Sequence, residues 1–440
     1  MSAMNSELAL FQPIPKERAV KSIKWINFRP TTQISSSGAI EFSVPGTTPY
    51  YVLLGKTMLH VKAKIMKMDG SNISEASENV SLTNLSMHSL FRQCDISLNQ
   101  QIINPNVGTS YPYKSYIDVL LRYNHSVKEG QLQAEGYAKD SAYGFDSRDN
   151  TAHWIRREWT KNSIIADFEG VLHDDLAQQS KAILNGVHIG VKLYQSTDDF
   201  RIFSRPVAAG SEEEGPTNYK VEIVDAVLRV CYLDLQPSVI IAHNNMLLKA
   251  PAVYPYWKSV VKSFAIPKGS YNFSVEDLFH GNCPCRLVVG FVSSEAFSGS
   301  MQKNPYNFSH YSLNFLEFSL NNVSVPGTAL QPKFENDPDE TNPVKCYKNG
   351  YKREYLTLFR NQYPQQDGLF ISADDYPGGY CLYSFDIKPG TSKHLFCDLL
   401  SGHTRLSGRF DVPLPEPVVV VCYASFPAEF KIDESRLVIP

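Results

Sequence analysis

The sequence predicts an all-β protein made of two tandem eight-stranded antiparallel jelly rolls, each with a short helix and long loops. Its 440 residues are enough for two domains of roughly 200 residues, each able to bury its own core. The chain holds 24 Tyr, 24 Phe and 27 Pro, a composition that favours strands and ordered loops over helices. It also repeats itself, because MHSLFRQCDISLNQQIINP around Met87 returns as HYSLNFLEFSLNNVSVPG around His310.

The repeat extends beyond this one pattern. The first copy is followed by YPYKSYIDVLLRYN (Tyr111–Asn124) and the second, in the same order, by CYKNGYKREYLTLFRNQ (Cys346–Gln362). A spacing of about half the chain is the size of a whole domain and too long for a solenoid repeat. Two weaker correspondences pair DFEG (Asp167–Gly170) with SFDI (Ser384–Ile387), and NGVHIGVKL (Asn185–Leu193) with SGHTRLSGRF (Ser401–Phe410).

The first half is predicted to be strands interrupted by one helix. Residues 1–20 are expected to form an extended arm, because Pro13 and Pro15 oppose a helix. Tyr113–Leu121 carries apolar side chains at helical spacing, whereas the polar stretch 126–162 is predicted to be a long loop. Apolar runs and alternation predict strands from Ser22 onward, at Ile40–Val44, Leu59–Ile65, Ile164–Leu172 and Val187–Tyr194.

The second half is predicted to begin after a linker at 204–218, which is rich in Gly and Pro and holds three consecutive Glu. The expected boundaries are therefore an arm at 1–20, a first roll at 21–203, the linker, and a second roll at 219–440. The predicted elements are a strand at Tyr219–Leu235 with a bulge near Val224, a strand buried on both faces at Arg286–Val292, an acidic loop at 326–342, a helix at Tyr351–Phe359, and paired closing strands at Arg405–Val412 and Pro417–Phe426.

Bulk properties exclude several classes of protein. The formal net charge is −3, whereas proteins that grip nucleic acid are usually basic, so no sequence-specific nucleic-acid binding is expected. The longest apolar run, Val418–Phe426, is far shorter than the about 20 residues that a spanning helix needs, so no membrane span is expected. The first residues show no secretory signal. The eight cysteines are therefore expected to be buried free thiols in a reducing compartment.

No catalytic or cofactor motif stands out. Gly55-Lys56-Thr57 imitates the end of a phosphate-binding loop but lies amid strand signals. Asp374-Asp375 is expected to point to opposite faces of a strand, and no Gly-x-Ser-x-Gly elbow is present. The sequence therefore assigns no catalytic and no cofactor-binding residue, and the protein is not expected to be an enzyme.

Metal and ligand motifs are equally weak. Cys283-Pro-Cys285 lacks the second pair that a zinc ribbon needs and is expected to be a structural loop. His173-Asp174-Asp175 offers metal-ligand chemistry, although an exposed loop explains it as well. Trp154 and Trp159 are interpreted as aromatic anchors that pack a loop onto a neighbouring subunit, with base stacking as an alternative. No metal and no cofactor is predicted.

Seven strings, in family order from residue 24 onward, resemble the major capsid protein of Polinton (Maverick) elements and the related adintoviruses. The strings KNPYNF and LQPKFEN are the most specific to that family. The matching segments are KWINFRPTTQI (Lys24–Ile34), GAIEFSVPG (Gly38–Gly46), SLFRQCDISLN (Ser89–Asn99), YPYKSYIDVLL (Tyr111–Leu121), KNPYNFSHYSLNFLEFSLN (Lys303–Asn321), LQPKFEN (Leu330–Asn336) and YCLYSFDIKP (Tyr380–Pro389).

The resemblance implies a double jelly roll of the adenovirus-hexon lineage that forms homotrimeric, pseudo-hexagonal capsomers. These would tile an icosahedral shell around double-stranded DNA, with neighbouring capsomers and with penton and minor or cement proteins as partners. The protein would be made in the host cytoplasm and located in the virion, with the nucleus as a candidate place of assembly. The alternatives are a tandem β-sandwich that binds glycans or an enzyme on such sandwiches, for example a copper monooxygenase or an amidase.

Overall fold

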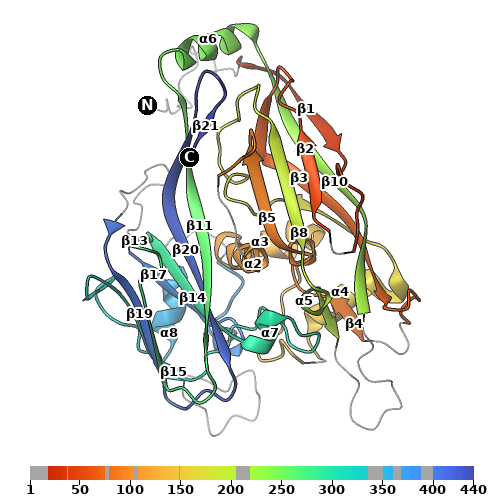
Figure 1. The fold of residues 1–440 in the computed structure, drawn as a ribbon. Coiled ribbons are helices and arrows are strands. Elements are labelled where there is room, and N and C mark those ends of the chain that lie inside the picture. Colours follow the sequence, from red (N-terminus) through yellow and green to blue (C-terminus); the bar gives the residue numbers. More distant parts are fainter. Residues whose placement is uncertain are drawn as a thin grey trace, which may run out of the picture.

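The computed structural model describes residues 18–36, 38–74, 79–103, 108–147, 149–204, 219–334, 350–359, 368–387 and 400–440. Two jelly rolls stand side by side, with helices α2 and α3 between them and helix α6 across one end (Figure 1). The predicted fold class, two tandem antiparallel jelly rolls, is confirmed.

The first roll consists of two four-stranded antiparallel sheets. One sheet has the order β1 (Val20–Phe28), β10 (Tyr219–Leu235), β3 (Tyr51–Lys67) and β7 (Ala166–Val171). The facing sheet has the order β2 (Ile40–Val44), β8 (Ile189–Gln195), β5 (Phe91–Leu98) and β6 (Gln101–Ile102).

The second roll repeats this order strand for strand. One sheet runs β11 (Ala252–Ile266), β20 (Val418–Ile432), β14 (Arg286–Ser293) and β17 (Leu382–Asp386), with β21 (Val438–Ile439) added to β20. The other runs β12 (Asn272–Glu276), β19 (Thr404–Phe410), β15 (Leu313–Leu320) and β16 (Val323–Ser324). In the part of the chain that the structure describes, two short ladders lie outside the rolls, β4 (Val80–Leu82) with β9 (Ile202–Ser204), and β13 (Asn282–Cys283) with β18 (Leu400–Ser401).

The repeat seen in the sequence corresponds to matching hairpins. Asn99 begins the turn between β5 and β6, and Asn321 begins the turn between β15 and β16, both with positive φ. Asn99 exchanges two hydrogen bonds with the backbone of His188, at 2.8 and 2.7 Å. Asn321 makes the same pair with the backbone of His403, both at 2.8 Å. The weaker sequence correspondence between the segments of β8 and β19 is therefore structural as well.

The position of β10 corrects the expected domain boundary. This strand was assigned from sequence to the second half, but it pairs with β1 and β3 and completes the first roll. The predicted bulge is present, because the register with β3 shifts between Ile223 and Asp225. The second roll therefore starts at β11, and helix α6 (Pro237–Leu247) connects the two. Of the predicted linker, residues 205–218 lie outside the described residues, as do residues 1–17 of the arm and 335–342 of the acidic loop.

Helices are more numerous than expected. The two predicted helices are present as α2 (Tyr111–Arg122) and α8 (Lys352–Thr357). The stretch 126–162, predicted to be a loop, contains α3 (His125–Glu129), η1 (Gln131–Glu135), α4 (Thr151–Thr160) and η2 (Lys161–Ser163). Within the described residues, the remaining short helices are α1 (Ser86–Ser89), α5 (Asp198–Arg201), α7 (Ser294–Ser298) and η4 (Tyr376–Gly378). The expected pairing of the two closing strands is also wrong, because β19 and β20 lie in different sheets.

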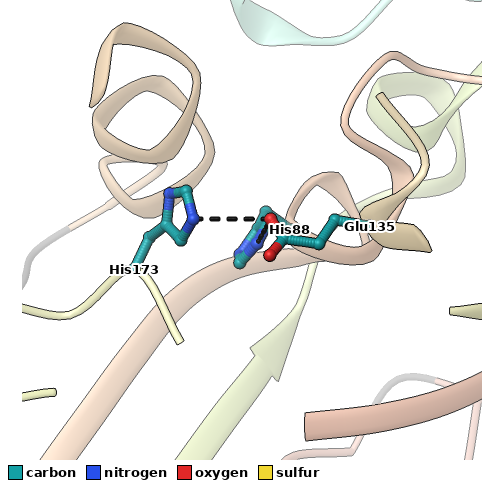
Figure 2. A group of neighbouring side chains, drawn as sticks. All are labelled: His88, Glu135 and His173. Atoms are coloured by element: carbon teal, nitrogen blue, oxygen red, sulfur yellow. Dashed lines mark hydrogen bonds and ion pairs between the residues drawn. The ribbon is translucent and has the colours of Figure 1, made fainter. Parts of the chain in front are cut away.

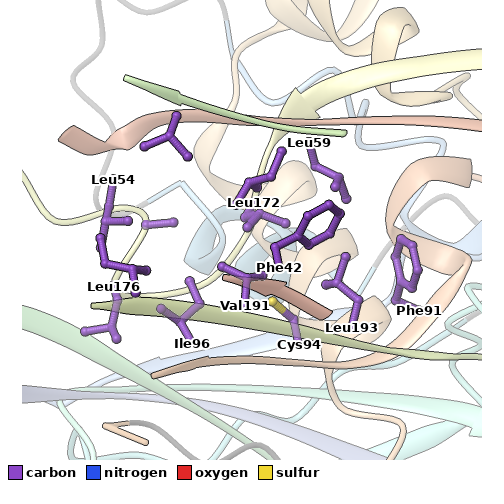
Figure 3. Close-up of a cluster of buried hydrophobic side chains, with 14 of the residues drawn as sticks. Phe42, Leu54, Leu59, Phe91, Cys94, Ile96, Leu172, Leu176, Val191 and Leu193 are labelled. Carbon is purple, nitrogen blue, oxygen red and sulfur yellow. The ribbon is translucent and has the colours of Figure 1, made fainter. Parts of the chain in front are cut away.

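Each roll buries its own apolar core, and the two cores meet between the rolls. In the first roll, Phe42, Leu59 and Leu193 are among the side chains that fill the space between the sheets (Figure 3). The ends of β11 and β20 contribute to this first core. Helix α2, which belongs to the first half of the chain, packs Tyr113 and Tyr116 into the second core and Tyr111 into the first. The rolls therefore share side chains.

The paired asparagine turns allow a matched test of the duplication. Asn99→Ala and Asn321→Ala should each lower the free energy of unfolding by about 1–2 kcal/mol, since alanine is strained at positive φ and cannot accept the backbone hydrogen bond. Asn→Gly at either position should cost less, because glycine tolerates the turn. Urea unfolding of the four variants measures this, and a loss at only one of the two turns would contradict their equivalence.

Candidate functional site

Helix α2 carries a charged stripe although nearly all of it is buried. Lys114, Asp118 and Arg122 are spaced four residues apart and therefore lie on one face of the helix. Asp118 bonds both cations, at 3.1 Å to Lys114 Nζ and 3.0 Å to Arg122 Nε. The side chains of Lys114 and Asp118 are only 2% and 1% exposed. The buried carboxylate of Asp118 is therefore paired with a cation on each side.

The stripe connects the two rolls. Lys114 also bonds Asp175 at 3.1 Å, and the backbone N–H of Ser259 on β11 donates to the same carboxylate at 2.6 Å. The hydroxyl of Tyr423 on β20 donates to Asp118 at 2.8 Å and accepts from Arg122 at 2.8 Å. The contacts made by Ser259 and Tyr423 cross from the second half of the chain to the first.

The electrostatics of the stripe favour the charged forms. Burial alone would raise the pKa of Asp118, but Arg122 and Lys114 lower it to about 2. Burial likewise opposes the charge on Lys114, yet the carboxylates of Asp118 and Asp175 raise its pKa. By contrast, burial and the neighbouring Asp175 raise the pKa of Asp174 to about 7.

A second polar node lies around Asp140, which is fully buried. Its carboxylate accepts hydrogen bonds from Asn84 and Asn150, both at 2.8 Å, and forms an ion pair with Arg156 at 3.0 Å. Asn304 of the second half donates to the same carboxylate at 3.3 Å. Asp140 thus joins the helical insertion of the first roll to the second half.

The KNPYNF string, which contains Asn304, makes further contacts with the first roll near this node. Its Tyr306 stacks on Tyr116 of α2 with ring centroids 4.0 Å apart, and its hydroxyl contacts Ser89 at 2.7 Å. Asn304 and Asn307 also bond the carboxylate of Asp146, at 2.6 Å through the backbone and 2.9 Å through the side chain. The KNPYNF string therefore connects the second roll to the first, and we call it the strap.

His173 and its neighbours are placed differently from the expectation of an exposed loop. His173, Asp174 and Asp175 are all buried. His173 lies with His88 and Glu135 in a group whose ligand atoms are within 4.8 Å of one another (Figure 2). Among the described residues, these three could together hold a metal ion.

The other sequence motifs do not converge on a site. Gly55-Lys56-Thr57 lies within strand β3. Asp374 and Asp375 lie in a turn, not on a strand, and Asp375 is paired with Lys139 at 2.7 Å. The described cysteines are buried as expected, but Cys285 is disulfide-bonded, so the expectation of free thiols is wrong there.

The two tryptophans lie on helix α4. Trp159 packs edge-on against Phe168 of β7, with ring centroids 6.2 Å apart. Trp154 is 39% exposed, and the Arg157 guanidinium lies 5.0 Å from the centre of its ring. The pair therefore does not form one stacking platform, and Trp154 is the more exposed of the two.

Exposed apolar side chains gather on two elements. On β1, Ile23 is 50% exposed and Trp25 is 46% exposed. On α6, Ile241 and Met246 are 59% and 60% exposed, and the adjoining groove of about 590 Å³ is lined mainly by apolar side chains, including Val239 and Leu247. No helix in the described part of the chain is long and apolar enough to cross a membrane.

Comparisons with known proteins agree with this architecture. The fold matches a chain of the Sputnik virophage with a TM-score of 0.67, covering 99% of this chain and 91% of that one at 11% identity. It matches the mavirus major capsid protein with a TM-score of 0.52, covering 100% and 95% at 10% identity, and the Faustovirus major capsid protein with 0.51, covering 99% and 93% at 8% identity.

The chain is a double jelly roll. At the level of sequence, no protein-family model matches it. The uncharacterized protein F54H12.2 of Caenorhabditis elegans is 24% identical over 433 residues, covering 96% of this chain and 97% of the relative. The likeness to the relative and to the solved structures therefore extends over both rolls and the segment between them.

Asp118→Asn should lower the free energy of unfolding at pH 7 by about 3–5 kcal/mol, because Lys114 and Arg122 lose a buried partner. The folded pKa of Asp118, about 2, lies below its usual 3.8. The stabilisation by Asp118 is therefore complete above a pH of about 4 and lost as the pH falls toward 2. Urea unfolding at several pH values should show the gap between variant and native protein shrinking across this window.

The side chain of Asp149 is exposed, so Asp149→Asn is the matched control. It should change the free energy of unfolding by less than about 0.5 kcal/mol at every pH. If the loss in Asp118→Asn is absent, or stays the same at a pH of about 2, the pairing of Asp118 with its two cations does not stabilise the folded protein.

Proposed function

We propose that this protein is a major capsid protein whose homotrimers form pseudo-hexagonal capsomers of an icosahedral viral shell. The observation that carries the proposal is the strand-for-strand duplication of one jelly roll in a single, internally locked unit. Solved major capsid proteins of mavirus and Faustovirus share this fold over nearly their whole length. The role is structural, and no enzymatic activity is proposed.

The duplication suits hexagonal tiling. Three copies of a chain with two similar rolls present six similar corners around a threefold axis, since homo-oligomers close by point symmetry. The two rolls keep separate loops and can therefore make different contacts at alternate corners. The strap and the charged stripe would hold the angle between the rolls constant, which a regular shell requires.

The exposed apolar side chains of β1 and α6 also support assembly. Contiguous apolar surface on a soluble chain usually marks an interaction site. In the proposed particle, such surfaces would be covered by other copies of the chain or by penton and minor capsid proteins. Obligate interfaces of this kind bury upward of about 2,000 Å².

The lineage we propose is that of Polinton (Maverick) elements and adintoviruses. The seven matching strings support it, and a full-length relative in a nematode fits an element carried in an animal genome. The enclosed genome would be double-stranded DNA, held without sequence-specific contacts, in keeping with the net charge of −3. The location would be the virion, after synthesis in the host cytoplasm.

Light scattering on a sizing column, with negative-stain images of the same peak, tests the proposal. The expected mass is three times the chain mass of 49.5 kDa, with hexagonal outlines or assembled shells. A stable bilobed particle of a single chain mass at micromolar concentration would contradict it and favour the tandem glycan-binding alternative.

A further inference from the structure

The group formed by His88, Glu135 and His173 is built from three separate parts of the first half. His88 lies on α1, Glu135 ends η1, and His173 follows β7. All three are buried, with His173 at 0% and Glu135 at 7% exposure. Both imidazoles approach the same carboxylate oxygen, at 3.2 Å from His88 Nε2 and 3.4 Å from His173 Nε2 (Figure 2).

These distances suit a shared cation. Metal bonds of about 2.0–2.1 Å in tetrahedral geometry place neighbouring ligand atoms roughly 3.3 Å apart. The other ring nitrogen of His88 contacts the Tyr111 hydroxyl at 2.8 Å, which is the outer contact that usually orients a metal-binding imidazole. That contact leaves His88 Nε2 to face the carboxylate.

His173 provides an independent observation. Neither of its ring nitrogens makes a hydrogen bond within the described part of the chain, although the side chain is fully buried. Buried polar groups are bonded in the large majority of cases. A cation between the two imidazoles and the carboxylate would give Nε2 of His173 a closer partner than the Glu135 oxygen, which lies 3.4 Å away.

The neighbouring cation, Lys114, is already paired with other carboxylates, so the negative charge of Glu135 has to be balanced within its own group. The nearby ammonium of Lys114 donates to the backbone carbonyl of His173 and is paired with Asp118 and Asp175. The absence of a side chain at position 170 leaves space for Glu135, because a Cβ on Gly170 would clash with Glu135 Cγ. Gly170 belongs to the DFEG string that the sequence repeat singled out.

We infer that His88, Glu135 and His173 bind one divalent transition-metal cation of the zinc class. Two imidazoles and one carboxylate are ligands that such cations accept. The site is buried, so the bound cation is structural: it ties η1 and the insertion that follows to α1 and to the segment after β7. The inference does not depend on the capsid role.

Metal analysis of the full-length chain, expressed without a histidine tag and purified without chelator, tests the inference. Plasma mass spectrometry should find about one divalent cation per chain in the native protein and almost none in Glu135→Gln or His173→Gln. His153→Gln is the matched control, because His153 is equally buried but bonds Asn79 and Ser81. This variant should lose stability and keep the metal.

A second measurement covers the case in which the ligand variants do not fold. Native protein stripped with a chelator should unfold at a lower temperature, and adding Zn²⁺ alone should restore the original midpoint. A folded native protein that contains no metal and does not respond to Zn²⁺ would overturn the inference. So would an equal metal content in native protein and in folded Glu135→Gln.

Discussion

The structure depends on a buried carboxylate that both rolls help to satisfy. Asp118 is only 1% exposed and is held by Lys114 and Arg122 from its own helix and by Tyr423 from the second roll. An unpaired charge in such a place would cost several kcal/mol, so helix α2 is stable only where these partners are in reach. The rolls therefore pack in one orientation, because rotating one roll would break the hydrogen bond from Tyr423 to Asp118.

The same logic extends along the junction. The Asp140 node and the Tyr306 strap repeat the pattern of a buried polar group on one half completed by the other. Apolar packing alone tolerates small slides, whereas hydrogen-bonded charges fix distances and angles. A duplicated fold with a fixed angle between its halves is what a regular pseudo-hexagonal shell would need from its subunit.

Local patterns allowed much of the fold to be predicted. Alternation identified β2 and the core face of β3, and the slip at Val224 identified the bulge of β10, because these signals depend only on neighbouring residues. The sequence prediction places β10 in the wrong roll, because the alternation of apolar residues along a strand does not show which strands it pairs with. Helix α4 was missed because its buried face is polar, with His153 and Arg156 in place of apolar side chains.

The junction was harder to predict than the rolls. The four-residue spacing of Lys114, Asp118 and Arg122 in an otherwise apolar helix was a usable signal for a buried charged stripe. No comparable signal brings His88, Glu135 and His173 together, because they come from distant segments of the chain. Only the three-dimensional structure shows that these three side chains are buried together.

Hydrogen exchange across a urea series, followed by mass spectrometry on peptides from the central strands β3 and β14, tests the claim that the rolls form one locked unit. Both strands are expected to lose protection at the same urea concentration, because the buried charges at the junction have all their partners only when both rolls are folded. Exposure of β14 while β3 stays protected, or the reverse, would contradict it and show two rolls that fold independently.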